Sequence, residues 1–354
     1  MQLRRSQSQS GSESGRSRMF LEAAEAPGSV RAQLAANAPL VQGLAARLRR
    51  APPRAVLTYG RGSSDNAATF ARYLIETRLG IMTASAPPSI SSVYDAATAM
   101  EGALCLVISQ SGQSPDLLAA AHAARDAGGL VVALVNDERS PLATLAELAL
   151  PLRAGPELSV AATKSFICSL SAVLQLVACW TEDAELTGAL GRLPQLLEAA
   201  WALDWSPALE PLEHAQSLYV LGRGIGFGVA QEAALKFKET CGLHAEAFSS
   251  AEVRHGPMAL VGPGFPVLAF IQDDETRPGV EAAAAACALQ GAPVMAAGGA
   301  PDSGVLRLPV RSAHPALEPL GQIQSFYKLA DALAHARGLD PDRPPHLFKV
   351  TETL

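Results

Sequence analysis

The stretch Ala55-Val56-Leu57-Thr58-Tyr59-Gly60-Arg61-Gly62-Ser63-Ser64 decides the fold of this chain. A run of strand-forming residues leads directly into glycines and serines, which is typical of a buried strand that turns sharply into a helix. The same pattern returns at Leu218–Gly224, where an apolar run leads into Gly222-Arg223-Gly224. Gly60 and Gly222 lie 162 positions apart, which indicates an internal repeat.

Two further landmarks repeat in the same order. Val267–Ile271 follows Leu104–Ile108 by 163 positions, and Gly291 follows Gly128 by the same distance. Such regular spacing favours a duplication. The alternative, that any two doubly wound sheets look alike, stays open at this stage.

The pattern between these landmarks alternates strands with helices. We expect helices over Met19–Arg50, from Ser63 to about Thr77, over Pro115–Ala127 and over Ser159–Thr181, with a strand at Leu130–Val135. Alternation of this kind predicts βαβ units and parallel sheets covered on both faces. The fold class is therefore α/β, with two duplicated domains of a three-layer, flavodoxin-like kind.

This organisation predicts four segments. Residues 1–18 are expected to be a flexible tail, 19–200 the first domain, 201–340 the second domain, and 341–354 a C-terminal tail. Met19 is an alternative start to Met1. No segment resembles a secretory signal peptide.

Composition excludes several classes of protein. The chain has 34 acidic and 28 basic residues, a net charge of −6, 49% hydrophobic and 18% charged residues. These values exclude global disorder and argue against nucleic-acid or membrane-surface partners. The five cysteines show no zinc or disulfide spacing, so we expect no metal and a reduced, cytoplasmic protein. No continuous apolar run reaches the roughly 18 residues of a membrane span.

A hydroxyl-rich loop follows the strand at Leu104–Ile108. Ser109, Ser111 and Ser114 precede Pro115, a favoured first residue of a helix. Free amides at a helix start, together with hydroxyls, can bind a small phosphomonoester. The alternative is an ordinary serine-rich turn. The second half carries Gln272-Asp273-Asp274-Glu275-Thr276 at this point, so the two loops cannot bind the same anion.

Possible proton carriers gather in the second half. Glu232, Lys236 and Glu239 share one helix face by their spacing, which fits either a solvated salt-bridge ladder or an acid/base site. His255 precedes Gly256-Pro257 and should lie in a turn. Lys349, near the end of the sequence, reads by position alone as a solvated charge.

Six separated motifs then resemble those of one family, the tandem sugar isomerase (SIS) domains of the glucosamine-6-phosphate synthase type. The motifs run in order: Gly62-Ser63-Ser64, Ser109–Ser114, Glu157–Lys164, Leu235–Glu239, His244–Ala247 and Arg254–Pro257. The resemblance covers nearly all of Met19–Leu354 and ends with Asp340–Lys349.

The resemblance implies a role for each matching residue. Ser109, Gln110, Ser111 and Ser114 match the family's phosphate loop, and Ser64 a further substrate contact. Glu239 matches the base that moves a proton between C1 and C2, and His255 the ring-opening residue that reaches across from a partner subunit. Lys349 matches a catalytic tail lysine. Lys236 and Glu232 match supporting groups on the helix of Glu239; we count Lys236 among the catalytic and Glu232 among the substrate-binding residues.

One departure narrows the expected reaction. The synthase begins with a glutaminase domain whose nucleophile is its first cysteine, whereas the first cysteine here is Cys105. The resemblance then implies an isomerising glucosamine-6-phosphate deaminase that needs no cofactor and forms a homodimer with a shared active site. An aldose–ketose isomerase, a fructosamine-6-phosphate deglycase and a non-catalytic sugar-phosphate-binding regulator remain alternatives. The sugar epimer, the physiological direction and any effector stay undetermined.

Overall fold

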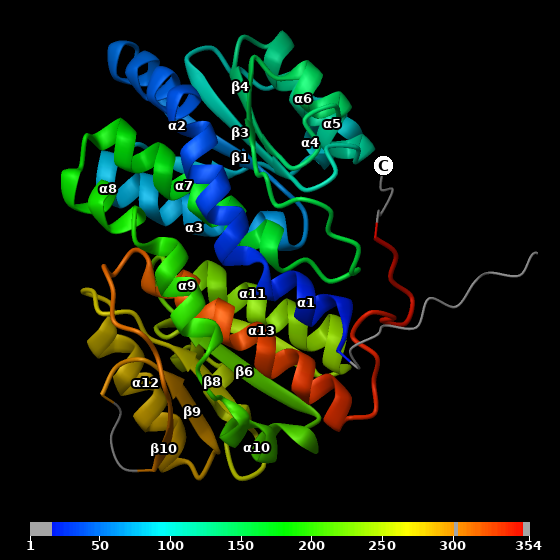
Figure 1. Ribbon diagram of the computed structural model, residues 1–354, viewed down its shortest axis with the longest axis vertical. Coiled ribbons are helices and arrows are strands. Elements are labelled where there is room, and N and C mark those ends of the chain that lie inside the picture. Colours follow the sequence, from blue (N-terminus) through cyan, green and yellow to red (C-terminus); the bar gives the residue numbers. More distant parts are fainter. Residues whose placement is uncertain (1–15, 301–303, 350–354) are drawn as a thin grey trace, which may run out of the picture.

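The computed structural model describes residues 16–300 and 304–349, and these residues form two five-stranded parallel sheets (Figure 1). The first sheet has the order β2-β1-β3-β4-β5 and the second β10-β9-β8-β6-β7. Read from β7 to β10, the second sheet has the same order as the first: β7, β6, β8, β9 and β10 take the places of β2, β1, β3, β4 and β5. This agreement confirms the duplication. The strands are β1 (Ala55–Tyr59), β2 (Thr83–Ser85), β3 (Ala103–Ser109), β4 (Leu130–Val135), β5 (Leu148–Pro151), β6 (Ser217–Gly222), β7 (His244–Ser249), β8 (Val267–Phe270), β9 (Val294–Ala297) and β10 (Val305–Leu308).

Helices cover both faces of each sheet, as the continuous burial of β3 and β8 requires. The helices are α1 (Arg18–Ala24), α2 (Ala26–Arg50), α3 (Ser63–Leu79), α4 (Ser89–Ser92), α5 (Pro115–Asp126), α6 (Pro141–Leu145), α7 (Lys164–Thr181), α8 (Ala184–Leu190), α9 (Leu193–Trp201), α10 (Leu209–Glu213), α11 (Gly226–Cys241), α12 (Arg277–Leu289) and α13 (Glu318–Ala336). The strands and helices expected after Gly60 are thus found close to their expected bounds, except for the start of the helix expected over Ser159–Thr181.

A layer of helices joins the two halves into one body. Helices α3, α7, α11 and α13 lie between the sheets, and one hydrophobic core runs through this layer (Figure 1). α3 and α11 follow equivalent strands and pack against each other. Gly228 makes this close approach possible, because a Cβ there would lie 2.5 Å from the Asn66 carbonyl oxygen. The duplication therefore brings the starts of two equivalent helices together.

Two expectations about helices and one about the N-terminal tail were wrong in detail. The helix expected over Ser159–Thr181 begins at Lys164, because the carboxylate of Glu157 binds the backbone amides of Thr163 and Ser165 at its start. The helix expected over Met19–Arg50 is divided into α1 and α2. Ser17 and Arg18 belong to the folded chain, whereas residues 1–15 of the expected flexible tail lie outside the described residues.

Helix α7 is also the single helix, among the described residues, that is long and apolar enough to cross a membrane. The sequence predicted this helix but no continuous apolar run of that length, because serines and a glutamine interrupt its apolar residues. Of this helix 89% is buried inside the protein. α7 is therefore a core helix, and it packs against α2 and α3.

Candidate active site

A cavity of about 640 Å³ opens at the carboxyl ends of β1 and β3, where ligands bind in open α/β sheets. Its wall combines both halves of the chain with the tail. The lining residues are Arg61, Gly62, Ser63, Ser64, Ser109, Gln110, Ser111, Ser114, Leu117, Val160, Ala162, Lys236, Glu239 and Lys349. Eight of the ten residues selected from the sequence thus line one cavity, because α3 packs on α11.

The loop between β3 and α5 forms one side of this cavity. The Ser109 hydroxyl accepts the Gly112 N–H at 3.0 Å, and the Ser111 hydroxyl accepts the Gln113 N–H at 3.3 Å. Both hydroxyl protons thereby stay available for an anion. Gly112 has φ +63° and a Cβ there would lie 2.2 Å from the Ser140 Oγ, so only glycine fits. The loop is a preformed set of donors at a helix start.

Arg61 adds a charge to this loop that sequence analysis did not select. Its Nε and Nη2 donate to Asp116 Oδ2 at 2.8 and 2.7 Å, and its side chain remains 52% exposed. A guanidinium has five N–H donors, so others can face an anion in the cavity. The Gly60-Arg61-Gly62 turn was the available signal, but an arginine between two glycines predicts no direction for its side chain.

The second half does not offer such a loop. Asp274 accepts the backbone N–H and the hydroxyl of Thr276, and Gln272 donates to both Asp274 and Thr276. The start of α12 is thereby occupied by the chain's own carboxylate and amide. This difference is the physical reason that one half can bind an anion at this point and the other cannot.

A buried ion cluster on α11 forms the floor of the cavity. Lys236 Nζ donates to the Glu239 carboxylate and lies 3.4 Å from Glu232 Oε1. Lys236 and Glu232 are fully buried, whereas the Glu239 side chain is 21% exposed and lines the cavity. Glu232, Lys236 and Glu239 therefore form a buried acid/base cluster and not a solvated salt-bridge ladder.

Residues of α3 and α13 complete this cluster. Glu232 accepts hydrogen bonds from the Ser63 hydroxyl at 3.1 Å, the Asn66 amide at 2.9 Å and the Tyr327 hydroxyl at 3.4 Å. Glu232 does not line the cavity, so the structure gives it a supporting place and not the substrate contact expected from sequence. Asn66 and Tyr327 were missed, since their distance from Glu232 in the sequence offers no signal.

The pKa values of the cluster follow from burial and charge. Burial is the largest influence on Lys236 and would lower its pKa, but the Glu232 and Glu239 carboxylates together raise the pKa above its ordinary value. Burial raises the pKa of Glu232, which the Lys236 charge partly offsets. Lys236 is therefore a cation at neutral pH. Its charge lies directly against the carboxylate of Glu239.

The C-terminal tail places Lys349 at the rim of the cavity. Lys349 Nζ donates to the Ser159 carbonyl at 2.7 Å and lies 3.4 Å from Glu157 Oε2. The interpretation of Lys349 as a solvated charge is therefore wrong. Residues 350–354 of the expected catalytic tail lie outside the described residues.

His255 is the expected catalytic residue that the structure does not bring to the cavity of its own chain. It is exposed and follows the short 3₁₀ turn Glu252–Arg254, as the turn expected from Gly256-Pro257 requires. Strand β7, just before it, was not expected from the sequence. Its alternating burial leaves His244 and Glu246 exposed at the edge of the sheet.

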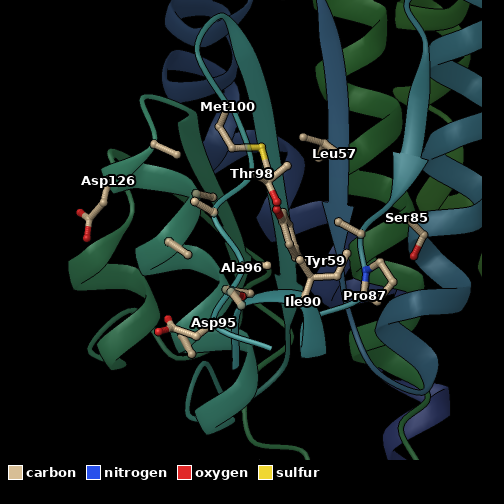
Figure 2. A pocket seen from close by; sticks show the side chains of 18 residues that line it. Leu57, Tyr59, Ser85, Pro87, Ile90, Asp95, Ala96, Thr98, Met100 and Asp126 are labelled. Atoms are coloured by element: carbon tan, nitrogen blue, oxygen red, sulfur yellow. The ribbon is translucent and has the colours of Figure 1, made fainter. Parts of the chain in front are cut away.

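A larger cavity, of about 780 Å³, lies on another face of the first half, against β1 and α5 (Figure 2). Leu57, Tyr59 and Met100 point into it with a row of alanines from α5. None of the residues selected from sequence lines it. Its lining is mostly apolar, with hydroxyls such as those of Ser85 and Thr98, and it contains two carboxylates, Asp95 and Asp126, and no cationic side chain.

Comparison with known proteins agrees with this geometry. The pattern of the family described as "SIS domain" matches residues 51–179 and 211–307, one segment in each half. The chain belongs to the SIS domain family. The expected resemblance is thereby confirmed, and the two SIS domains correspond to the two parallel sheets.

The names of similar proteins refer to phosphosugars. A glutamine–fructose-6-phosphate aminotransferase (isomerizing) from Aeropyrum pernix is 35% identical over 83% of this chain. The SIS pair spans about half the length of the curated relatives it matches, 50% in this case. A candidate phosphosugar isomerase from Silicibacter pomeroyi DSS-3 is 46% identical, with a TM-score of 0.88 over 92% of this chain and 100% of that one. A glucosamine-6-phosphate deaminase from Thermotoga maritima shares the fold, at 24% identity and a TM-score of 0.75 over 95% and 100% of the chains.

Ser111→Ala tests the anion loop of the first SIS domain. Loss of one hydroxyl donor to a phosphate should reduce kcat/KM by an amount equal to about 1.5–3 kcal/mol of transition-state stabilisation. Steady-state kinetics with a sugar phosphate and competition by inorganic phosphate measure it. Ser91→Ala, which changes a residue that lines the larger cavity, is the control. Unchanged kinetics in Ser111→Ala would remove this loop from the site.

Proposed function

We propose that this protein catalyses the isomerising deamination of an aminosugar 6-phosphate, with glucosamine 6-phosphate giving fructose 6-phosphate and ammonia. One observation carries the proposal: the partly exposed Glu239 carboxylate, paired with the buried Lys236 cation, shares a cavity with the anion loop at Ser109–Ser114. The similar proteins support a phosphosugar isomerase, and the finer assignment rests on this geometry together with the family resemblance.

The anion loop would hold the phosphate at one end of the substrate. Donors from Ser109, Ser111 and Ser114, with the Arg61 charge, fit three phosphate oxygens. Binding energy from this remote group positions C1 and C2 of the open chain against the floor of the cavity. Gln110 and Ser64 line the cavity next to the loop and are proposed to bind the sugar hydroxyls or phosphate.

Glu239 would act as the general base. It removes the proton from C2 and returns it to C1, while a proton passes from the amine nitrogen to O1, which converts the open-chain aminoaldose into a ketose imine. Lys236 donates a hydrogen bond to the Glu239 carboxylate and would stabilise negative charge that develops on the substrate. Water then adds to the C2 imine, and the carbon–nitrogen bond breaks to give the ketone and ammonia. This sequence balances without an oxidant or reductant.

Two catalytic roles complete the proposal. Lys349, at the rim, would contact the open-chain sugar near the reacting carbons. His255 would open the sugar ring from a second copy of the chain, since it is exposed and does not line the cavity of its own chain. The proposed assembly is therefore a homodimer with a shared active site.

An ammonia-release assay tests the reaction. We expect glucosamine 6-phosphate to yield equal amounts of ammonia and ketose phosphate, with galactosamine and fructosamine 6-phosphates as comparison substrates. Interconversion of an aldose and a ketose phosphate without ammonia would establish the plain isomerase instead. Preferred release from fructosamine 6-phosphate would establish the deglycase. Binding of these sugars without turnover would favour a regulator.

A further inference from the structure

The loop before α7 is built around one carboxylate. The Glu157 side chain has no exposed surface. Its Oε1 accepts the Thr163 N–H at 3.0 Å and the Ser165 N–H at 3.1 Å, and its Oε2 accepts the Ser165 hydroxyl at 2.5 Å. A carboxylate offers about four acceptor positions. These three bonds leave one acceptor position of the carboxylate unused. Lys349 Nζ lies 3.4 Å from Oε2.

The same loop supplies the second partner of Lys349. Glu22 of α1 accepts the backbone N–H groups of Leu158 at 2.5 Å and Ser159 at 3.1 Å. These bonds hold the backbone that carries the Ser159 carbonyl, which accepts from Lys349 at 2.7 Å. The ammonium is thus received by two acceptors on one anchored loop. Its side chain remains 25% exposed at the cavity.

We infer that Glu157 is a positioning residue that holds the Lys349 ammonium, and with it the C-terminal tail, at the rim of the cavity. The catalytic consequence of this inference rests on the proposed function. The contact between Glu157 and Lys349 does not depend on that function. A buried carboxylate attracts an ammonium more strongly than an exposed one, because water screens the pair less. Lys349 is otherwise attached to the fold only through a segment that follows α13 and contains no helix or strand within the described residues.

Glu157→Gln separates this role from the capping of α7. The Gln oxygen can still accept the two amides, and its NH₂ can donate to the Ser165 hydroxyl oxygen. It cannot accept the remaining hydrogen bond from Lys349. Ser165→Ala is the matched control, since it removes a hydroxyl that bonds Glu157 and leaves the carboxylate free for the ammonium.

Amine labelling measures the contact without activity. The folded full-length chain is treated with acetic anhydride, and the acetylation rates of Lys349 and of the exposed Lys238 are compared by mass spectrometry. We expect Lys349 to react at least about threefold faster in Glu157→Gln than in wild type, with the Lys238 rate unchanged. Ser165→Ala should resemble wild type. An unchanged Lys349 rate in Glu157→Gln overturns the inference.

A double-mutant cycle measures the catalytic consequence. Glu157→Gln should lower kcat about tenfold with little change in KM, because the anion loop is on other elements. In a Lys349→Ala background the same change should have no further effect. Additive losses would mean that Glu157 affects kcat independently of Lys349 and would overturn the inference. Faster labelling in a protein that turns over no sugar phosphate would support the inference and refute the proposed function.

Discussion

Glu239→Gln should lower kcat by at least about 10²-fold, the contribution expected of a positioned general base. Gln keeps the shape of the side chain and can still accept the hydrogen bond from Lys236, but it cannot take the proton from C2. KM should change little, because the phosphate donors stand on the loop before α5 and not on α11. Steady-state ammonia release from glucosamine 6-phosphate measures both constants.

The control for this variant is Glu246→Gln, which removes an exposed carboxylate of β7 that does not line the cavity. Its kinetics should match those of wild type. In wild type, solvent deuterium should enter C1 of the ketose, unless the shuttled proton is shielded from water. A Glu239→Gln enzyme with near wild-type turnover would contradict the assignment of Glu239 as the base.

Lys236→Met should lower the free energy of unfolding by about 3–5 kcal/mol at pH 7, the usual cost of removing one partner of a buried ion pair. Lys236 and Glu232 are both fully buried, so the Glu232 carboxylate would lose its cation with no water to replace it. Chemical denaturation measures the loss. Lys238→Met, at an exposed position of the same helix, should change stability by less than about 0.5 kcal/mol.

The pH dependence of this loss has a definite sign. The pKa of Glu232 is raised by burial from its ordinary value of 4.5, and removal of Lys236 should raise it further. The folded variant then binds a proton that the unfolded chain does not, so its stability should rise as the pH falls through the raised pKa toward 4.5. Denaturation at about pH 5 should therefore show a smaller loss than at pH 7.

A second substitution distinguishes an unpaired charge from lost packing. Adding Glu232→Gln to Lys236→Met removes the buried charge and should restore part of the stability, since the Gln oxygen can accept from the Asn66 amide and its NH₂ can donate to the Ser63 hydroxyl oxygen. A single variant with a loss below about 1 kcal/mol at pH 7, or a double variant no better than the single, would contradict the buried ion pair.

The fold was predictable because its evidence is local. The run Ala55–Tyr59 followed by Gly60-Arg61-Gly62 is a strand and a turn by its own composition, and its return at Leu218–Gly224 indicates the second copy without any contact. Short edge strands such as β2 and β10 were missed. They contain too few residues for a period of two to be recognised, and their pairing with neighbours defines them.

The phosphate loop was also selected by local pattern. An ordinary serine-rich turn was the alternative for this pattern, and the equally serine-rich Gly62-Ser63-Ser64 loop after the neighbouring strand favoured an anion site. The roles of Glu239, His255 and Lys349 came from the family resemblance, because no spacing rule connects three positions so far apart. Their roles remain proposals that the variants above test.

By itself the sequence determined the α/β class and the duplication and predicted an anion site at the hydroxyl-rich loop, since each depends on residues adjacent in the chain. Only the tertiary structure decided which charges are buried. The spacing of Glu232, Lys236 and Glu239 fits a solvated helix face equally well, and the packing of α3 across Gly228 is what removes water from Lys236. Likewise, Lys349 becomes part of the site because Glu157 and Ser159, about 190 positions earlier, present acceptors to its ammonium.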